Sequence, residues 1–323
     1  MVELAHGSVA TNGDWPSVIS ALRSLQAACA ARVCSPKRGD RIGFSLSSKD
    51  RLAYTLRTVQ ALDAEGGFDL IWNDGSDRAE VPDLSRYFQF RNARLVETNY
   101  GVRGGPDSAI CFGLRRLLEL GYDYIGLIEN DVVLRPGWLA TLLSLFDLAA
   151  AEGVVVGAAS VLGYKSRVLE YRQGYSIDWA RGAAMVLFSR PAAQLLLQRY
   201  STLKLSNCEI RGFYAQRFGV ALHVPEWCVG SQWMDGPLSM DWSYAPLLYQ
   251  HGYACVGSVP SMAHDLEFDV QKVMRTDYVG IQQNGAGLAH PGIALPALDG
   301  EFAMAAARAP AAIPALALRS SSV

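Results

Sequence analysis

The sequence predicts an α/β fold: a mainly parallel sheet flanked by helices on both faces, with a smaller C-terminal region. Between residues 42 and 134, short apolar segments that suit buried strands alternate with amphipathic segments that suit helices. Half of the 323 residues are hydrophobic and 19% are charged, as in a globular protein with a large core. Polar residues and glycines follow the apolar segments, and ligands of such sheets bind at the carboxyl ends of the strands.

The expected elements follow one another in chain order. Strands are expected at 42–46, 68–72, 93–97 and 125–134, because each is an apolar run followed by turn-forming residues. Helices are expected at 52–62, at 106–120, where Gly121 gives a C-terminal stop, and from about residue 138. The second half is less regular, with strands expected at 154–161, 183–188 and 255–262, and helices at 191–200 and 241–251.

Charge and hydropathy restrict the classes of partner. The formal net charge of -2 gives no reason to expect a nucleic-acid partner. No apolar stretch reaches the roughly 18 residues that a membrane span requires, and the N-terminus lacks the pattern of a signal peptide. A cytoplasmic location is therefore expected, with peripheral membrane association left open. The six scattered cysteines predict buried thiols, and the oligomeric state is not predicted.

The run from Ile125 to Leu134 delivers two carboxylates, Glu129 and Asp131, at its polar end. Residues two apart in an extended segment point the same way, so both could converge on one divalent cation that prefers oxygen ligands. The alternative is a strand followed by an ordinary acidic turn.

Two further clusters follow predicted strands. Asn73-Asp-Gly-Ser76 offers a carboxylate and a hydroxyl, although such a sequence is more often only a turn. The segment from Asn99 to Gly105 opens a helix with glycines and one arginine, which suits phosphate. It matches neither the phosphate-binding loop of nucleotide hydrolases nor the dinucleotide-binding fingerprint.

The order of these clusters resembles the nucleotide-sugar-dependent glycosyltransferases of the GT-A (Rossmann-like) fold, especially the inverting family 2. The resemblance covers residues 41 to 265 and lies in the order and spacing of short motifs. These are Asp50-Arg51, Asn73-Asp-Gly-Ser76, Asn99-Tyr-Gly101, the DxD-like Glu129-Asn-Asp131, Pro136-Gly-Trp-Leu139, Gly182 to Arg190, and Met240-Asp241.

The resemblance implies a role for each matching residue. Asp131 would coordinate Mg2+ or Mn2+ on the donor diphosphate, assisted by Glu129 and completed by His264. Asp241 would be the general base that activates the acceptor hydroxyl. The residues assigned to donor binding are Ser45, Arg51, Asp74 for the nucleobase, Arg103 and Asn130.

The chain departs from the family pattern at three positions. Glu129 replaces an aspartate, Met240 replaces a glutamate before the base, and Asp50 replaces an asparagine. Asp131 and Asp241, which the chemistry most needs, are both present.

Several assignments keep an alternative. Asp241 could instead be a helix N-cap, with Asp235 as the reserve base, and His264 could be an ordinary histidine. Trp233 and Trp242 could stack on an acceptor sugar or only pack in the protein.

The predicted function is metal-dependent inverting transfer from a nucleotide sugar, with a UDP-sugar as the first choice, to a carbohydrate or other hydroxyl acceptor. The alternatives are a retaining transferase of the same fold and a non-catalytic nucleotide- or sugar-binding module. The expected organisation is an N-terminal helical extension (1–40), the GT-A domain (41–265) and a C-terminal lid and Ala/Pro-rich tail (266–323). Within the domain, residues 41–135 would form the nucleotide-binding half and 136–265 the acceptor and base half.

Overall fold

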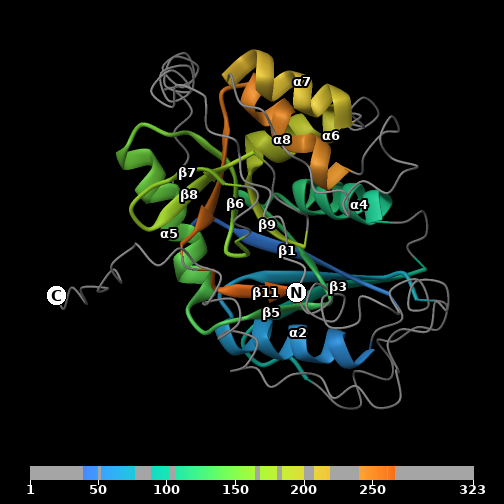
Figure 1. Ribbon diagram of the computed structural model, residues 1–323. Helices are drawn as coiled ribbons and strands as arrows, with labels where there is room; N and C mark the ends of the chain where they lie inside the picture. The colour runs from blue at the N-terminus through green and yellow to red at the C-terminus, as the bar shows by residue number, and fades with distance from the viewer. Residues whose placement is uncertain are drawn as a thin grey trace, which may run out of the picture.

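The structure is a computed structural model (Figure 1). At several helix and strand ends, only the backbone is described. The predicted N-terminal extension, except for residues 39 and 40, and the C-terminal lid and tail lie outside the described residues. The described residues are 39–49, 52–76, 89–101, 106–163, 168–179, 184–199, 207–218, 240–259 and 261–265.

A nine-stranded sheet forms the centre of the described part, in the order β3-β2-β1-β4-β9-β6-β10-β8-β7. Its first four strands are parallel, as predicted from the alternating pattern. They are β1 (Ile42–Ser48), β2 (Asp69–Asp74), β3 (Arg94–Tyr100) and β4 (Tyr124–Glu129).

The second half of the sheet is mixed, so the prediction of a mainly parallel sheet is confirmed for the first half only. β9 runs antiparallel to both β4 and β6, and β10 pairs parallel with β6 but antiparallel with β8. β7 and β8 are joined by a turn of only three residues, 172–174, and so short a connection can join only antiparallel strands. These strands are β6 (Val156–Ser160), β7 (Val168–Tyr171), β8 (Tyr175–Asp178), β9 (Met185–Ser189) and β10 (Ala254–Ser258).

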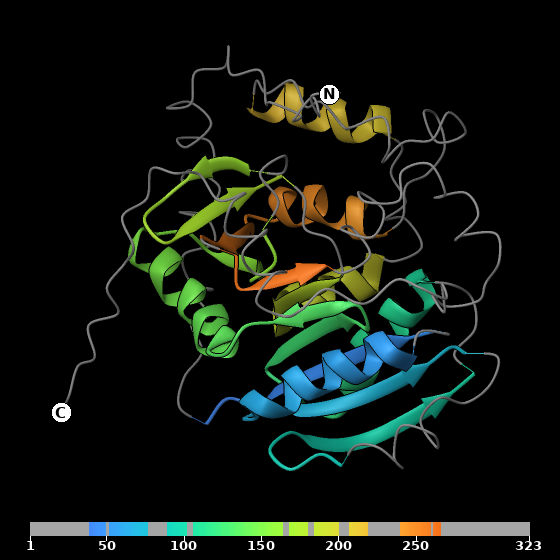
Figure 2. The same cartoon turned by 60° about the horizontal axis from the view of Figure 1, so that its bottom comes forward.

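Helices cover both faces of this sheet, as predicted, and the two views agree on their sides (Figures 1 and 2). α2 (Leu52–Glu65) and α5 (Trp138–Ala151) lie on one face. The opposite face carries α4 (Pro106–Glu119), α6 (Arg190–Arg199) and α8 (Met240–Gln250), with α7 (Asn207–Phe218) packed on α8.

Successive residues of β1 show the two faces in contact with different helices. The ring of Phe44 packs edge-on against Phe68 and Trp138, at centroid distances of 5.1 and 5.4 Å, on the α5 side. Ser45, the next residue, lies against Gly113 of α4. Both residues are fully buried, so β1 has no face exposed to water, as expected for a central parallel strand.

A separate two-stranded antiparallel sheet joins β5 (Val132–Leu134) to β11 (Ala263–Asp265). The predicted strand 125–134 is therefore two strands, β4 and β5, which belong to different sheets. No helix among the described residues is long and apolar enough to cross a membrane.

Candidate functional site

Polar residues line up across the carboxyl ends of the four parallel strands. The strand register places Asn99 beside Asn73, Asn73 beside Ser47, and Ser47 beside Glu129. The order of strands thus brings together three of the clusters that the sequence singles out. This edge of the sheet is where ligands of parallel α/β sheets bind.

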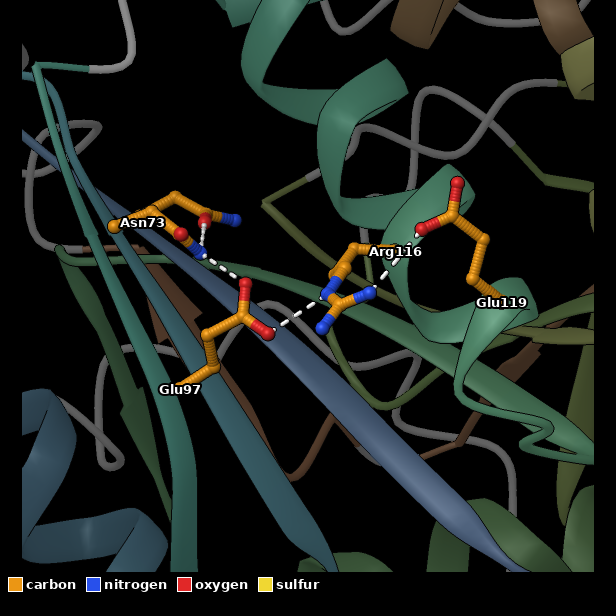
Figure 3. A network of polar contacts seen from close by, with 5 residues as sticks. Asn73, Glu97, Arg116 and Glu119 are labelled. Atoms are coloured by element: carbon orange, nitrogen blue, oxygen red, sulfur yellow. Dashed lines mark hydrogen bonds and ion pairs between the residues drawn. The ribbon is translucent and has the colours of Figure 1, made fainter.

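On the α4 side of this edge, the polar side chains bond to one another. Asn73 Nδ2 donates to Ser45 Oγ at 2.7 Å, and Asn99 Nδ2 donates to Asn73 Oδ1 at 3.0 Å and Glu97 Oε1 at 2.9 Å. Arg116 of α4 donates from Nε to Glu97 Oε2 at 2.7 Å and pairs with Glu119 (Figure 3). The network ties β1, β2 and β3 to α4. It also holds the Ser45 side chain within β1, short of the strand end at Ser48. A role of Ser45 in donor binding therefore stays a prediction.

The charge of Glu97 is stabilised by this network. Partial burial acts against the charged form, but hydrogen bonds from Asn99 and Arg116 outweigh it and hold the pKa of Glu97 below its ordinary value. Neither Glu97 nor Arg116 was predicted from the sequence as a site residue, because their pairing joins two elements, β3 and α4, that meet only on folding.

Asp74 ends β2, and the contacts described for it include the hydrogen bond of a turn. Its Oδ1 accepts the backbone N–H of Ser76 at 2.9 Å and lies 3.5 Å from Ser48 Oγ. Ser48 in turn accepts a hydrogen bond from Trp72 Nε1 at 2.8 Å. The described geometry is thus an Asx turn, which was the plain alternative for this motif, and contact with a nucleobase stays a prediction.

The segment of Glu129, Asn130 and Asp131 is not extended as the sequence analysis assumed. β4 ends at Glu129, and Asn130 and Asp131 form a turn before β5 begins. The alternation rule therefore does not decide whether the two carboxylates point the same way. Asp131 is buried, at 3% exposure, whereas Glu129 is half-buried and its backbone N–H donates to Ala184 O at 2.9 Å.

Helix α2 holds this turn through two threonine hydroxyls. Thr58 Oγ1 lies 2.9 Å from Asn130 O and 3.0 Å from Val132 O, and Asn130 Nδ2 donates to Thr55 Oγ1 at 2.8 Å. Neither threonine was predicted from the sequence as a site residue. The available signal was their spacing of three residues, which places both on the helical face that also carries Leu52, Val59 and Leu62.

β11 brings His264 next to the segment that follows Asp131. His264 is paired with Val133, and Asp265 with Val132, in the antiparallel register of β11 and β5. The register is continued by Arg135, whose backbone N–H donates to Met262 O at 2.9 Å. The backbone of His264 thus lies two positions along this ladder from Asp131, although its side chain is not described.

The remaining predicted residues are not brought together by the described part of the chain. Asp241 and Trp242 lie in the first turn of α8, where only the backbone is described. The donor residues Arg51 and Arg103, and the acceptor-side residues Trp233 and Asp235, lie outside the described residues.

The carboxylate oxygens of Asp131 and Glu129, close in sequence at the sheet edge, suit Mg2+ or Mn2+ in ligand type. Among the residues that the structure describes, no group of three or more His, Cys, Asp or Glu side chains is placed to hold a metal ion. Asp131, Glu129 and the undescribed side chain of His264 are therefore the residues to test.

Comparison with known proteins gives no family for this chain. No family model matches the sequence, and no curated protein is significantly similar to it. Only the residues and their placement therefore bear on function.

Proposed function

We propose that this protein is a metal-dependent, inverting glycosyltransferase of the GT-A fold. It would move a sugar from a nucleotide-sugar donor, with a UDP-sugar as first choice, to a hydroxyl group of a carbohydrate or other acceptor. The observation that carries the proposal is the buried Asp131 carboxylate in a turn directly after the central strand β4. The polar row across β3, β2, β1 and β4 and the pairing of β11 with β5 support it.

Asp131, with Glu129 and His264, would hold Mg2+ or Mn2+. Held by these residues, such an ion would supply charge neutralisation for the diphosphate leaving group. Asp74 would accept a hydrogen bond from the nucleobase, and Arg51 and Arg103 would lie near the ribose and the diphosphate.

Asp241 would act as the general base. It removes the proton of the acceptor hydroxyl while that oxygen bonds to the anomeric carbon of the donor sugar. The bond from this carbon to the diphosphate breaks on the opposite side, the nucleoside diphosphate leaves, and the anomeric configuration inverts. General-base help of this kind is worth about 10²–10⁴ in rate.

The test is a screen of nucleotide sugars for slow donor hydrolysis, because it requires no known acceptor. Free nucleoside diphosphate is measured with and without Mn2+ for the wild type, for Asp131→Asn, and for Asp147→Asn as a matched control on an exposed site of α5. We expect Mn2+-dependent release from one donor, reduced at least about 100-fold in Asp131→Asn, because the ion contributes several kcal/mol. The control should match the wild type.

No release of nucleoside diphosphate from any donor, together with no Mn2+-dependent nucleotide binding, would overturn the proposal. Once a donor and an acceptor are found, NMR of the product gives its anomeric configuration. Retention, together with an Asp241→Asn variant of normal rate, would identify a retaining transferase. Binding of the nucleotide sugar without turnover would identify a binding module. The cytoplasmic location expected from the sequence also remains a proposal.

A further inference from the structure

The turn that carries Asp131 is fixed by hydroxyl groups of a helix that supplies none of the predicted metal ligands. Thr55 and Thr58 lie on α2, are fully buried, and are separated by about one helical turn. Both face the link between β4 and β5, which belong to different sheets. A second structural element thus determines where this turn sits.

Thr58 contacts the backbone on both sides of Asp131 in the chain. Its hydroxyl lies 2.9 Å from the carbonyl oxygen of Asn130, the residue before, and 3.0 Å from that of Val132, the residue after. One hydroxyl hydrogen is shared between the two carbonyls, so the backbone on either side of Asp131 is held at the same point.

Thr55 adds a third point of attachment. Its Oγ1 accepts the Asn130 side-chain amide at 2.8 Å, and both side chains are buried. Burying a hydroxyl against a sheet is unfavourable unless it is hydrogen-bonded, and an apolar residue would fill the space without that requirement. The two hydroxyls therefore specify the conformation of the turn more narrowly than apolar packing would.

We infer that Thr55 and Thr58 are positioning residues for the Asp131 carboxylate, and that the side-chain amide of Asn130 contributes to this positioning through its hydrogen bond to Thr55. The inference rests on the proposed function, since it takes Asp131 as a metal ligand. Groups that orient a metal ligand typically contribute 10–100-fold to metal affinity. Because Thr58 acts through the backbone of the turn, we expect an effect of about 10-fold, at the low end of that range.

The test measures Mn2+ binding directly. The electron paramagnetic resonance signal of free Mn2+ is followed as the full-length protein is added in the presence of UDP. Four proteins are compared: the wild type, Thr58→Val, Thr58→Ser and Thr141→Val. Thr58→Val keeps the shape and removes the hydroxyl, whereas Thr58→Ser keeps the hydroxyl. Thr141 is the matched control, because its hydroxyl donates at 3.0 Å to the carbonyl of Gly137, the N-cap residue of α5, away from the turn at Asp131.

We expect Thr58→Val to raise the Kd for Mn2+ about 10-fold, with Thr58→Ser and Thr141→Val close to the wild type. Equal Mn2+ affinity in the wild type and Thr58→Val would overturn this inference and leave the proposed function standing. Absence of Mn2+ binding by the wild type would overturn the metal site and this inference together. Should circular dichroism show that Thr58→Val does not fold, Thr55→Val replaces it with the same expected loss of affinity.

Discussion

At the residue scale, Gly126 of β4 leaves no room for a side chain. It pairs with Phe44 in the parallel ladder of β1 and β4, and a Cβ atom there would lie 2.1 Å from Cδ1 of the Phe44 ring. The ring cannot turn aside without disturbing its edge contacts with Phe68 and Trp138. The glycine thus allows a bulky aromatic residue in the centre of the sheet.

Gly126→Ala is expected to lower the free energy of unfolding by about 1–3 kcal/mol, because overpacking displaces a fixed ring. Urea denaturation at neutral pH measures the change. The control is Gly212→Ala, in an exposed part of α7 where a Cβ meets no atom within 4 Å. That substitution should stabilise the protein by about 0.5–1 kcal/mol, since alanine favours a helix. Equal stability of Gly126→Ala and the wild type would contradict the described packing.

At the scale of elements, the pair of Glu97 and Arg116 attaches the edge strand β3 to α4 (Figure 3). Hydrogen bonds from Asn99 and Arg116 overcome the effect of burial and keep the pKa of Glu97 below its ordinary value of 4.5. The unfolded chain therefore binds a proton at Glu97 at a higher pH than the folded protein does. The stabilisation is complete above the unfolded pKa and is lost as the pH falls through the folded pKa.

We expect the free energy of unfolding to fall less between about pH 6 and about pH 3 in Glu97→Gln than in the wild type. Urea denaturation at the two pH values gives the comparison. Glu119→Gln is the matched control, because Glu119 contacts the same guanidinium but is 53% exposed, where water screens the interaction. An equal fall in the free energy of unfolding in Glu97→Gln and the wild type would show that the pair of Glu97 and Arg116 does not contribute to stability in solution.

At the scale of the whole molecule, one sheet runs through both halves that the sequence analysis distinguishes. β9 lies between β4 and β6, and its residues are all buried, so the two halves share a ladder and a core. A buried thiol reports on each half: Cys111 in α4 and Cys255 in β10.

Both thiols should become reactive at the same urea concentration, because unfolding one half would expose the apolar faces of β4 and β9. Pulsed alkylation followed by peptide mass spectrometry separates these two cysteines from the other four of the chain. Two distinct urea midpoints, one for the reactivity of each thiol, would show that residues 41–135 and 136–265 unfold independently.

Much of the local structure could be predicted from the sequence. β1, β2, β3 and β4 overlap the predicted strands, and α6 and α8 lie within one residue of the predicted helices. Buried strands and amphipathic helices have short-range periodicity, which a sequence displays directly. The clustering of Asn73, Asn99 and Glu129 at one edge also followed from the expectation that the first strands are parallel.

The order of elements, the parallel first half of the sheet and the edge at which its polar residues meet could thus all be predicted from the amino-acid pattern. The antiparallel pairings of β9, the turn at Asn130 and Asp131, and the pairing of β11 with β5 became evident only in the folded chain. The same holds for the contacts of Thr55 and Thr58 with that turn. Helix and strand periodicity is set by neighbouring residues, whereas strand direction and side-chain contacts depend on segments that are distant in sequence and meet on folding.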